Sequence, residues 1–268
     1  IVFGDWSSDV CSSDLACQTA DSLIAEFSGF TSKGFYEGWE ARNLPTTWPA
    51  TVGSNLTKQN TGVDYGYFEQ DLDWGWPPLA SSIVDPVFAY AMDNNDSDSN
   101  YYASAAGAGY NGHATAFSWA ITVRVNGSSG ATGTLYAYAN NSSSNDSFGF
   151  RKETVNGGFS AFIRPGGASF SLSTPDIDES DVDTGKIHDL VATLEASIGS
   201  DSLLRLYHNG LEVGNLRINA TFTPSASLYH SILNFADGSA GCRNVSVLSA
   251  HTSNVTLTPT QVKAWHDS

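Results

Sequence analysis

The second half of the chain alternates hydrophobic and polar residues with a period of two. Over residues 114–125, Phe117, Trp119, Ile121 and Val123 fall on one face, and polar residues fall on the other. Such alternation is typical of antiparallel strands that bury one side. Shorter runs of the same kind follow at residues 135–139, 148–151, 159–164, 170–172, 187–196, 202–207, 211–213, 216–222, 231–235 and 244–248. This many short strands, separated by Gly, Ser and Asn clusters, predicts an all-β sandwich or jelly roll.

Two local motifs predict where the chain turns and how it ends. Asn209-Gly210 lies between two apolar runs. This dipeptide favours the type I′ turn of a β-hairpin, because both of its residues tolerate positive φ. Near the C-terminus, Thr258 and Gln261 are spaced as a capping box, with a proline at the first helical position. We therefore expect one short C-terminal helix that packs Trp265 on the sandwich, since so short a helix is not stable alone.

The first third of the chain is less regular. Residues 64–74 and 86–92 are predicted strands. Residues 5–15 read DWSSDVCSSDL, which matches one reading frame of a common short-read sequencing adapter. We therefore interpret residues 1–15 as an adapter-derived artefact and exclude them from fold reasoning, as one excludes a tag. Residues 16–268 are expected to form a single domain.

Composition narrows the class of protein. Aromatic residues make up 12% of the 268 residues, which argues against a disordered chain. With 28 Asp and Glu against 12 Lys and Arg, the formal net charge is −16 at pH 7. So acidic a chain is poorly suited to neutralising phosphates, and we expect no nucleic-acid partner. No stretch approaches the ~20 consecutive apolar residues that cross a bilayer, so we expect no membrane insertion.

The cysteines leave two interpretations open. Once Cys11 is set aside with the adapter segment, Cys17 and Cys242 remain. They form either a disulfide between the terminal strands of the sandwich or two buried thiols, because sequence alone does not show that their Cα atoms come within bonding range. A zinc site is not expected, since the chain has no Cys-x-x-Cys pair and its histidines are scattered.

Two segments of the second half resemble a known family. Residues 184–193 read TGKIHDLVAT, and residues 204–214 read LRLYHNGLEVG. This pair resembles the hairpin of laminin-G-like jelly rolls in the concanavalin A-like lectin and glucanase superfamily, and the resemblance extends over most of residues 45–268. The chain has Ile187 where that family usually has Trp, a difference that affects packing. The resemblance implies an all-β, two-sheet antiparallel jelly-roll sandwich with a short C-terminal helix, formed by residues 16–268.

The strongest catalytic candidate is an acidic run in the first third. Glu69, Asp71 and Asp73 point to one side if residues 64–74 form a strand. This run resembles the Glu-x-Asp-x-Glu pattern of the glucanase branch, in which the outer carboxylates act as nucleophile and acid/base. Asp73 is one methylene shorter than the glutamate of that pattern. The alternative, which we favour, is the solvent-facing side of an outer strand, so no catalytic residue is expected.

A second acidic group is a candidate calcium site. Asp93, Asp96 and Asp98 lie in one loop, and carboxylate oxygens are the ligands that calcium selects. The resemblance to laminin-G-like sandwiches, which often hold calcium at a loop rim, favours this metal as the one candidate cofactor. The competing interpretation is that these residues are ordinary turn formers.

Four aromatic residues are candidate ligand contacts, because exposed rings stack on sugars. They lie in or next to the Gly- and Pro-rich loops of the first half and comprise Trp76, Tyr101, Tyr102 and Tyr110. The competing interpretation is that their rings pack in the core or at the rim.

Nine Asn-x-Ser/Thr sequons occur in the chain. They indicate either a glycosylated surface protein or a polar, loop-rich exterior protein of a bacterium or virus. The predicted glycosylation sites are Asn55, Asn126, Asn219, Asn244 and Asn254.

These features lead to one favoured function and two alternatives. The superfamily includes lectins, adhesion modules, structural modules and glycoside hydrolases, so the fold does not decide the function. We expect a non-enzymatic extracellular, cell-surface or virion-surface module that binds glycan or adheres to a neighbouring surface protein. The first alternative is a structural subunit of an extracellular fibre or capsid assembly, present as a homo-oligomer or filament. The second is a polysaccharide hydrolase or lyase that uses Glu69 and Asp73.

Overall fold

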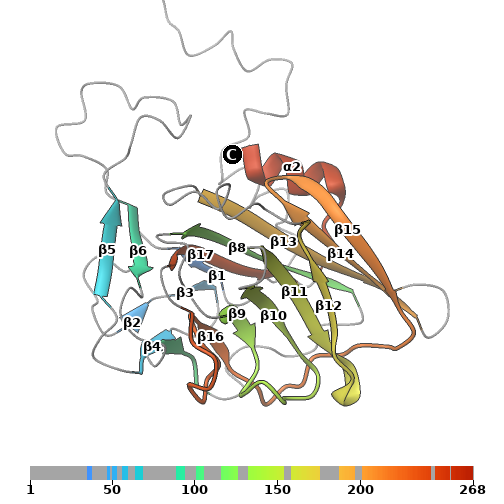
Figure 1. Cartoon of the computed structure of the whole chain (residues 1–268), viewed down its shortest axis with the longest axis horizontal. Coiled ribbons are helices and arrows are strands. Elements are labelled where there is room, and N and C mark those ends of the chain that lie inside the picture. The colour runs from blue at the N-terminus through green and yellow to red at the C-terminus, as the bar shows by residue number, and fades with distance from the viewer. Residues whose placement is uncertain are drawn as a thin grey trace, which may run out of the picture.

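Two antiparallel sheets stacked face to face build the protein (Figure 1). The computed structural model describes residues 35–37, 47–48, 50–52, 56–59, 64–68, 89–93, 101–105, 116–125, 132–153, 158–175, 187–196, 201–242, 245–253 and 255–267. Among them, no helix is long and apolar enough to cross a membrane. The two sheets and the short helix at the end of the chain confirm the predicted all-β, two-sheet antiparallel sandwich.

The first sheet has nine strands within the described ranges. Its main path runs β15-β14-β13-β8-β17-β1-β3, and β6, which carries β5, also pairs with β17. The bounds are β1 Phe35–Glu37, β3 Ala50–Val52, β5 Asp64–Phe68, β6 Ala89–Asp93, β8 Phe117–Val125, β13 Ile187–Ala196, β14 Ser202–His208, β15 Leu211–Ile218 and β17 Val245–Ser253. The long antiparallel ladders of β8, β13, β14 and β17 form its centre.

The second sheet has eight strands in the part of the chain that the structure describes. Their order is β12-β11-β10-β9-β16-β7-β4-β2. The bounds are β2 Thr47–Trp48, β4 Leu56–Lys58, β7 Tyr102–Ala103, β9 Gly133–Tyr138, β10 Ser147–Lys152, β11 Phe159–Arg164, β12 Phe170–Ser173 and β16 His230–Ile232. A short 3-10 turn at Pro165–Gly167 connects β11 to β12. This sheet lies below the first in Figure 1.

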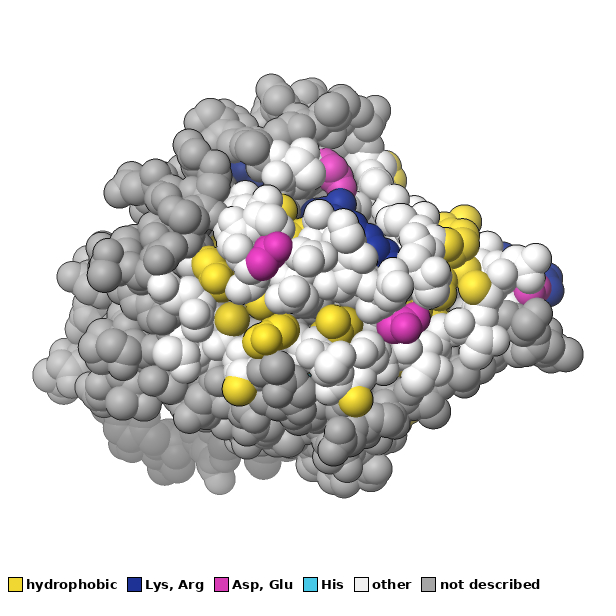
Figure 2. Space-filling view, turned by 90° about the horizontal axis from the view of Figure 1, so that it is seen from below, with side chains coloured by type: hydrophobic (Ala, Val, Ile, Leu, Met, Phe, Trp, Pro, Cys, Tyr) yellow, Lys and Arg dark blue, Asp and Glu magenta, His cyan; other side chains and the backbone are white. Residues whose placement is uncertain are grey.

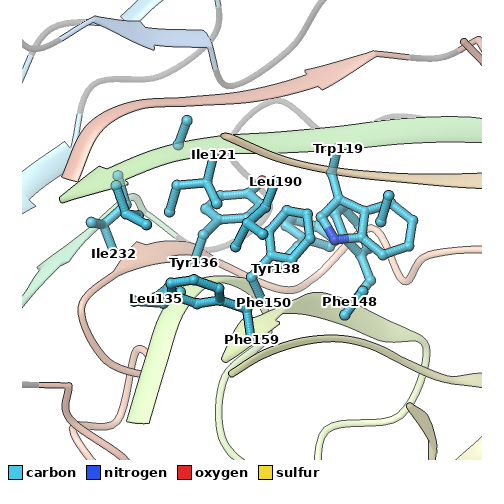
Figure 3. Packing of buried hydrophobic residues seen from close by; sticks show 14 of the residues in the cluster. Trp119, Ile121, Leu135, Tyr136, Tyr138, Phe148, Phe150, Phe159, Leu190 and Ile232 are labelled. Atoms are coloured by element: carbon cyan, nitrogen blue, oxygen red, sulfur yellow. The ribbon is translucent and has the colours of Figure 1, made fainter. Parts of the chain in front are cut away.

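The core between the sheets is built from aromatic rings (Figure 3). Phe117 and Trp119 on β8 point toward Phe148 on β10, and the ring centroids of Phe148 lie 4.9 Å from Phe117 and 5.1 Å from Trp119. The indole Nε1–H of Trp119 donates to the carbonyl oxygen of Gly149 at 3.2 Å, so its polar edge is satisfied inside the core. Each such ring pair contributes about 0.5–1.5 kcal/mol beyond its area burial. The predicted inward face is thereby confirmed over Phe117–Val125.

The outer face of the first sheet is covered by the C-terminal helix α2, Pro259–Asp267 (Figure 1). Val262 and Ala264 of α2 are buried with Ala120, Val191 and Tyr207, which project from β8, β13 and β14. The capping box forms as predicted. The backbone N–H of Thr258 donates to the Gln261 side chain at 2.9 Å, and the Gln261 N–H donates back to the Thr258 hydroxyl at 3.3 Å.

A polar contact holds the end of α2 against the sheet. The Nδ1 atom of His266 lies 2.6 Å from Oδ2 of Asp189, and the Thr122 hydroxyl donates to the other carboxylate oxygen at 2.7 Å. The predicted Asn-Gly turn lies directly beneath, with φ of 49° at Asn209 and 77° at Gly210. A Cβ at Gly210 would meet the His266 ring at 3.1 Å, so the missing side chain lets the helix end approach the hairpin.

Several strand boundaries differ from the sequence prediction, and three of the differences in the second half are large. Residues 211–218 form one continuous strand, β15, because its pairing with β14 carries the chain through the Gly214-Asn215 segment that the sequence pattern treats as a break. The strand predicted at residues 231–235 ends at Ile232, because Leu233 has a φ of 70° and directs the chain into a loop. The last strand extends to Ser253.

The contact between His266 and Asp189 predicts a pH-dependent stability. The hydrogen bond to Asp189 raises the pKa of His266 above its ordinary 6.5. Because the folded state holds the proton more tightly, this stabilisation is complete below about pH 6 and is lost as pH rises through the folded pKa. The melting temperature of the wild type should therefore exceed that of His266→Gln by more at pH 5.5 than at pH 8.5. Burial lowers the pKa of neighbouring His208, and the charge of His266 lowers it further.

Arg217→Gln is the matched control, since it removes an exposed ion pair, with Nη2 2.6 Å from Asp201, at the end of β15 away from the Gly210 turn. A melting-temperature difference for His266→Gln that stays constant, or grows, with rising pH would contradict the assignment.

Candidate functional site

The register between β10 and β11 places two arginines on the outer face of the second sheet. Phe148 and Phe150 point into the core, so Gly149 and Arg151 point outward. Gly149 lies directly opposite Phe162, and Arg151 and Arg164 occupy outward positions on either side of that pair, two residues away along the strands. We call this surface, formed by Arg151, Arg164, Phe162 and Phe235, the arginine face.

Both guanidinium groups of the arginine face pack against the same two rings. The Cζ atom of Arg151 lies 4.7 Å from the Phe162 centroid and 5.6 Å from that of Phe235. The corresponding distances for Arg164 are 5.0 and 5.9 Å. The two rings meet edge to face, with centroids 6.2 Å apart, and both are almost wholly buried. Each cation–π contact contributes about 0.5–2 kcal/mol, rising as water is excluded.

Phe235 reaches this surface on a tightly held loop, residues 233–242. The side-chain oxygen of Asn234 accepts the backbone N–H of Phe235 at 2.8 Å and that of Ala240 at 2.7 Å. The loop is also closed on itself, since the Cys242 N–H donates to the Leu233 carbonyl at 2.8 Å. Phe235 is thus placed over the sheet by backbone hydrogen bonds as well as by packing.

The charge of this face is poorly compensated. Within the described residues, neither Arg151 nor Arg164 makes a hydrogen bond or ion pair through its guanidinium, and Nη1 of Arg164 is buried without a partner although the residue is only 7% exposed. Burial lowers the pKa of both arginines, and the charge of Arg151 lowers that of Arg164 further. The nearest carboxylate influence is that of Glu153, which raises the pKa of Arg151 and accepts a hydrogen bond from the Ser160 hydroxyl.

Figure 2 shows this side of the molecule, seen from below the view of Figure 1. Lys and Arg side chains gather near the middle of the described surface, with uncharged and apolar side chains around them and an Asp or Glu side chain at one end. The two outer faces of the sandwich therefore differ. The first sheet is covered by α2, and the second carries the half-buried guanidinium of Arg151.

Of the four predicted aromatic contacts, Tyr101 lies at the margin of the arginine face. Its hydroxyl donates to the carbonyl oxygen of Ala236 at 2.8 Å, and its ring packs against Gly238 in the same loop. Burial and the charge of Asp237 raise its pKa. Tyr102 belongs to strand β7. Trp76 and Tyr110 are outside the described residues.

The other sequence-predicted sites are mostly outside the described residues. Asp93 ends strand β6, and no group of metal-binding side chains is found within the described ranges. Cys242 is buried, and Asn219 is exposed just after β15. The remaining residues are outside those ranges, so the disulfide, calcium, catalytic and glycosylation assignments stay predictions. They comprise Cys17, Asn55, Glu69, Asp73, Asp96, Asp98, Asn126, Asn244 and Asn254.

The arginine face itself was absent from the sequence prediction. A usable signal was present, because Arg151 and Arg164 occupy outward positions of two adjacent period-two runs in a chain with few basic residues. Phe162 also falls on an outward position, where an apolar residue needs a cover. No local sequence pattern predicts that Phe235 belongs to the arginine face, because its position depends on the path of the loop after β16.

Comparison with known proteins places the fold among binding domains and enzymes. No protein-family model and no curated protein match the chain. Domain 4 of AbnA, an extracellular GH43 arabinanase from Geobacillus stearothermophilus, in complex with arabinotriose, matches with a TM-score of 0.58 and 14% identity over 88% of this chain and 98% of that one. The binding domain of botulinum neurotoxin DC in complex with SialylT matches with a TM-score of 0.57 and 12% identity, over 88% and 51% of the two chains.

Trypanosoma rangeli sialidase, in complex with 2,3-difluorosialic acid, has a TM-score of 0.57 and 12% identity, over 89% of this chain and 32% of that one. The chain thus spans about half of the neurotoxin chain and a third of the sialidase chain. At these identities the likeness shows the fold alone, a two-sheet antiparallel β-sandwich. The concanavalin A-like and laminin-G-like assignments stay predictions.

The packing of Phe162 on Gly149 predicts that a side chain at this glycine is costly. A Cβ there would collide with the Tyr136 carbonyl oxygen and lie 2.9 Å from both Ala137 Cα and Phe162 Cε1. Gly149→Ala should therefore lower the free energy of unfolding by about 1–3 kcal/mol in chemical denaturation. The control is Ser171→Ala, at the exposed position opposite Phe162 on β12, which should change it by less than about 0.5 kcal/mol. Equal stability of the two variants would contradict this packing.

Proposed function

We propose that the chain is a non-enzymatic glycan-binding module that holds a saccharide on its arginine face. The observation that carries the proposal is the pair of guanidiniums, which are fixed on aromatic rings and make no ion pair within the described residues. Such donors bind hydroxyl and acidic oxygens with two parallel N–H bonds, and rings fix their orientation in advance. Little ordering entropy is then lost on binding.

The shape of the surface agrees with a saccharide chain as the ligand. Strand β12 lies beside β11 and presents exposed Ser171 and Ser173 on the same side as Phe162 and Ser160. The exposed hydroxyls of Ser171 and Ser173 lie on the same side of the sheet as the arginines, so an extended sugar can contact both. Support also comes from similar folds whose structures contain arabinotriose or SialylT. We propose an extracellular or surface location on the same grounds.

The hydrolase alternative rests on Glu69 and Asp73, which lie outside the described residues. The neurotoxin and arabinanase structures similar to this chain are described as a binding domain and as a separate domain of an enzyme. We therefore favour binding without cleavage, and the absence of newly formed reducing ends is part of the test below.

Substitutions that add a bulky side chain to one surface test where the ligand binds. Ser171→Trp places an indole beside Phe162 on the arginine face, whereas Asn215→Trp places one at an exposed position of β15 on the first sheet. Binding of the full chain to arabinan, dextran, polygalacturonate and sialylated oligosaccharides is measured by glycan array and calorimetry. We expect at least one saccharide to bind with a Kd between about 1 μM and 1 mM. Ser171→Trp should weaken that binding at least about tenfold, which is 1.4 kcal/mol.

Asn215→Trp should bind like the wild type, and both variants should melt close to it. Failure of every saccharide to bind, equal binding by both variants, or release of reducing ends would each reject the proposal.

A further inference from the structure

We propose that the arginine face selects anionic saccharides, those that carry carboxylate or sulfate groups, over neutral ones. This inference rests on the proposed glycan-binding function and names its ligand class. It is carried by the juxtaposition of Arg151 and Arg164 on Phe162, with a buried nitrogen of Arg164 that has no described partner.

Three other described basic side chains of this acidic chain are paired with nearby carboxylates. They comprise Arg205 with Glu195 at 3.7 Å and Glu212 at 3.4 Å, Arg217 with Asp201 at 2.6 Å, and Lys263 with Asp267 at 2.6 Å. Arg151 and Arg164 differ from these three residues, because they lie side by side on the second sheet and make no ion pair with a described carboxylate.

Leaving two positive charges together in a partly dry surface is unfavourable. Burial lowers the pKa of both arginines, and the positive charge of Arg151 lowers that of Arg164 further. Arginine nonetheless stays protonated in proteins, so the charge has to be balanced. The rings of Phe162 and Phe235 supply part of the balance, because their negative faces lie against the cations. An anion bound at this face would supply the rest.

The two arginines differ in access. Arg151 is half-buried, whereas Arg164 is only 7% exposed. We therefore assign direct contact with the anionic group to Arg151 and a supporting charge to Arg164. Glu153, bonded to the Ser160 hydroxyl, lies near the Arg151 end and is the one described carboxylate that influences this arginine. A neutral sugar gains nothing from the second charge, so the pair favours acidic ligands.

The test compares matched probes that differ in charge. Polygalacturonate is paired with neutral galactan, and dextran sulfate with dextran, so that carboxylate and sulfate are examined separately. Binding of the full chain is measured by calorimetry at about 50 and 200 mM salt, because charge-assisted contacts weaken as salt rises. We expect at least one acidic probe to bind at least tenfold more tightly than its neutral partner, and higher salt to reduce this preference.

The variants are Arg151→Gln, Arg151→Lys and Arg164→Gln, with Arg217→Gln as a control that makes the same charge change at an exposed site on the first sheet. Arg151→Gln should weaken acidic binding at least tenfold, and Arg164→Gln severalfold. Arg151→Lys keeps the charge but loses the two-pronged fork, so intermediate binding is expected. Arg217→Gln should stay within twofold of the wild type. Thermal melts verify folding, and protection of the wild type by trigalacturonate gives a readout that needs no variant.

The experiment distinguishes failure of this inference from failure of the proposed glycan-binding function. If neutral and acidic probes bind equally well and Arg151→Gln has no effect, this inference falls while glycan binding stands. If Arg217→Gln weakens acidic binding as much as Arg151→Gln, the preference is a general charge effect, and the inference also falls. If no saccharide binds, the proposed function itself is rejected.

Discussion

The pairing of Phe162 with Gly149 across β11 and β10 sets the register that decides which side chains lie on each face of the second sheet. Side chains alternate along a strand, so a slip by one residue would move every side chain to the opposite face. In the observed register, Phe148 and Phe150 meet Trp119 in the core, and both arginines lie outside. The missing side chain at Gly149 leaves the space that the Phe162 ring occupies.

The two outer faces of the sandwich are covered by different elements. On the first sheet, α2 covers Ala120, Val191 and Tyr207, and the contact between His266 and Asp189 fixes its end. On the second sheet, the loop carrying Phe235 covers part of the surface and leaves the guanidiniums at its edge. A surface held in place by core packing on one side and a closed loop on the other is suited to recognition with little rearrangement.

The sequence predicted the fold well where patterns are local. The alternation in residues 114–125, the Asn209-Gly210 turn and the capping box at Thr258 each depend on neighbours within a few residues, and each is observed. Strand ends were less predictable. Leu233 leaves the sheet through a positive φ that a leucine gives no reason to expect.

The site was harder to predict because it joins elements distant in sequence. Candidates were sought among loop aromatics and acidic runs, and Tyr101 alone of these is described beside the arginine face, with its hydroxyl bonded to Ala236. Arg151 and Arg164 lie on strands, and their significance appears only when the register brings both to one ring. The likeness to solved structures shows a fold that serves several functions, so the chemistry of the surface has to identify the ligand.

The most direct test of the central claim observes the arginine side chains themselves. In a ¹⁵N NMR titration of the Nε–H groups with trigalacturonate, the account predicts that the resonance of Arg151 shifts with saturation, that Arg164 responds with it, and that Arg205 and Arg217 stay unmoved. A titration in which Arg205 or Arg217 responds while Arg151 stays constant would contradict the assignment of the binding surface to the second sheet.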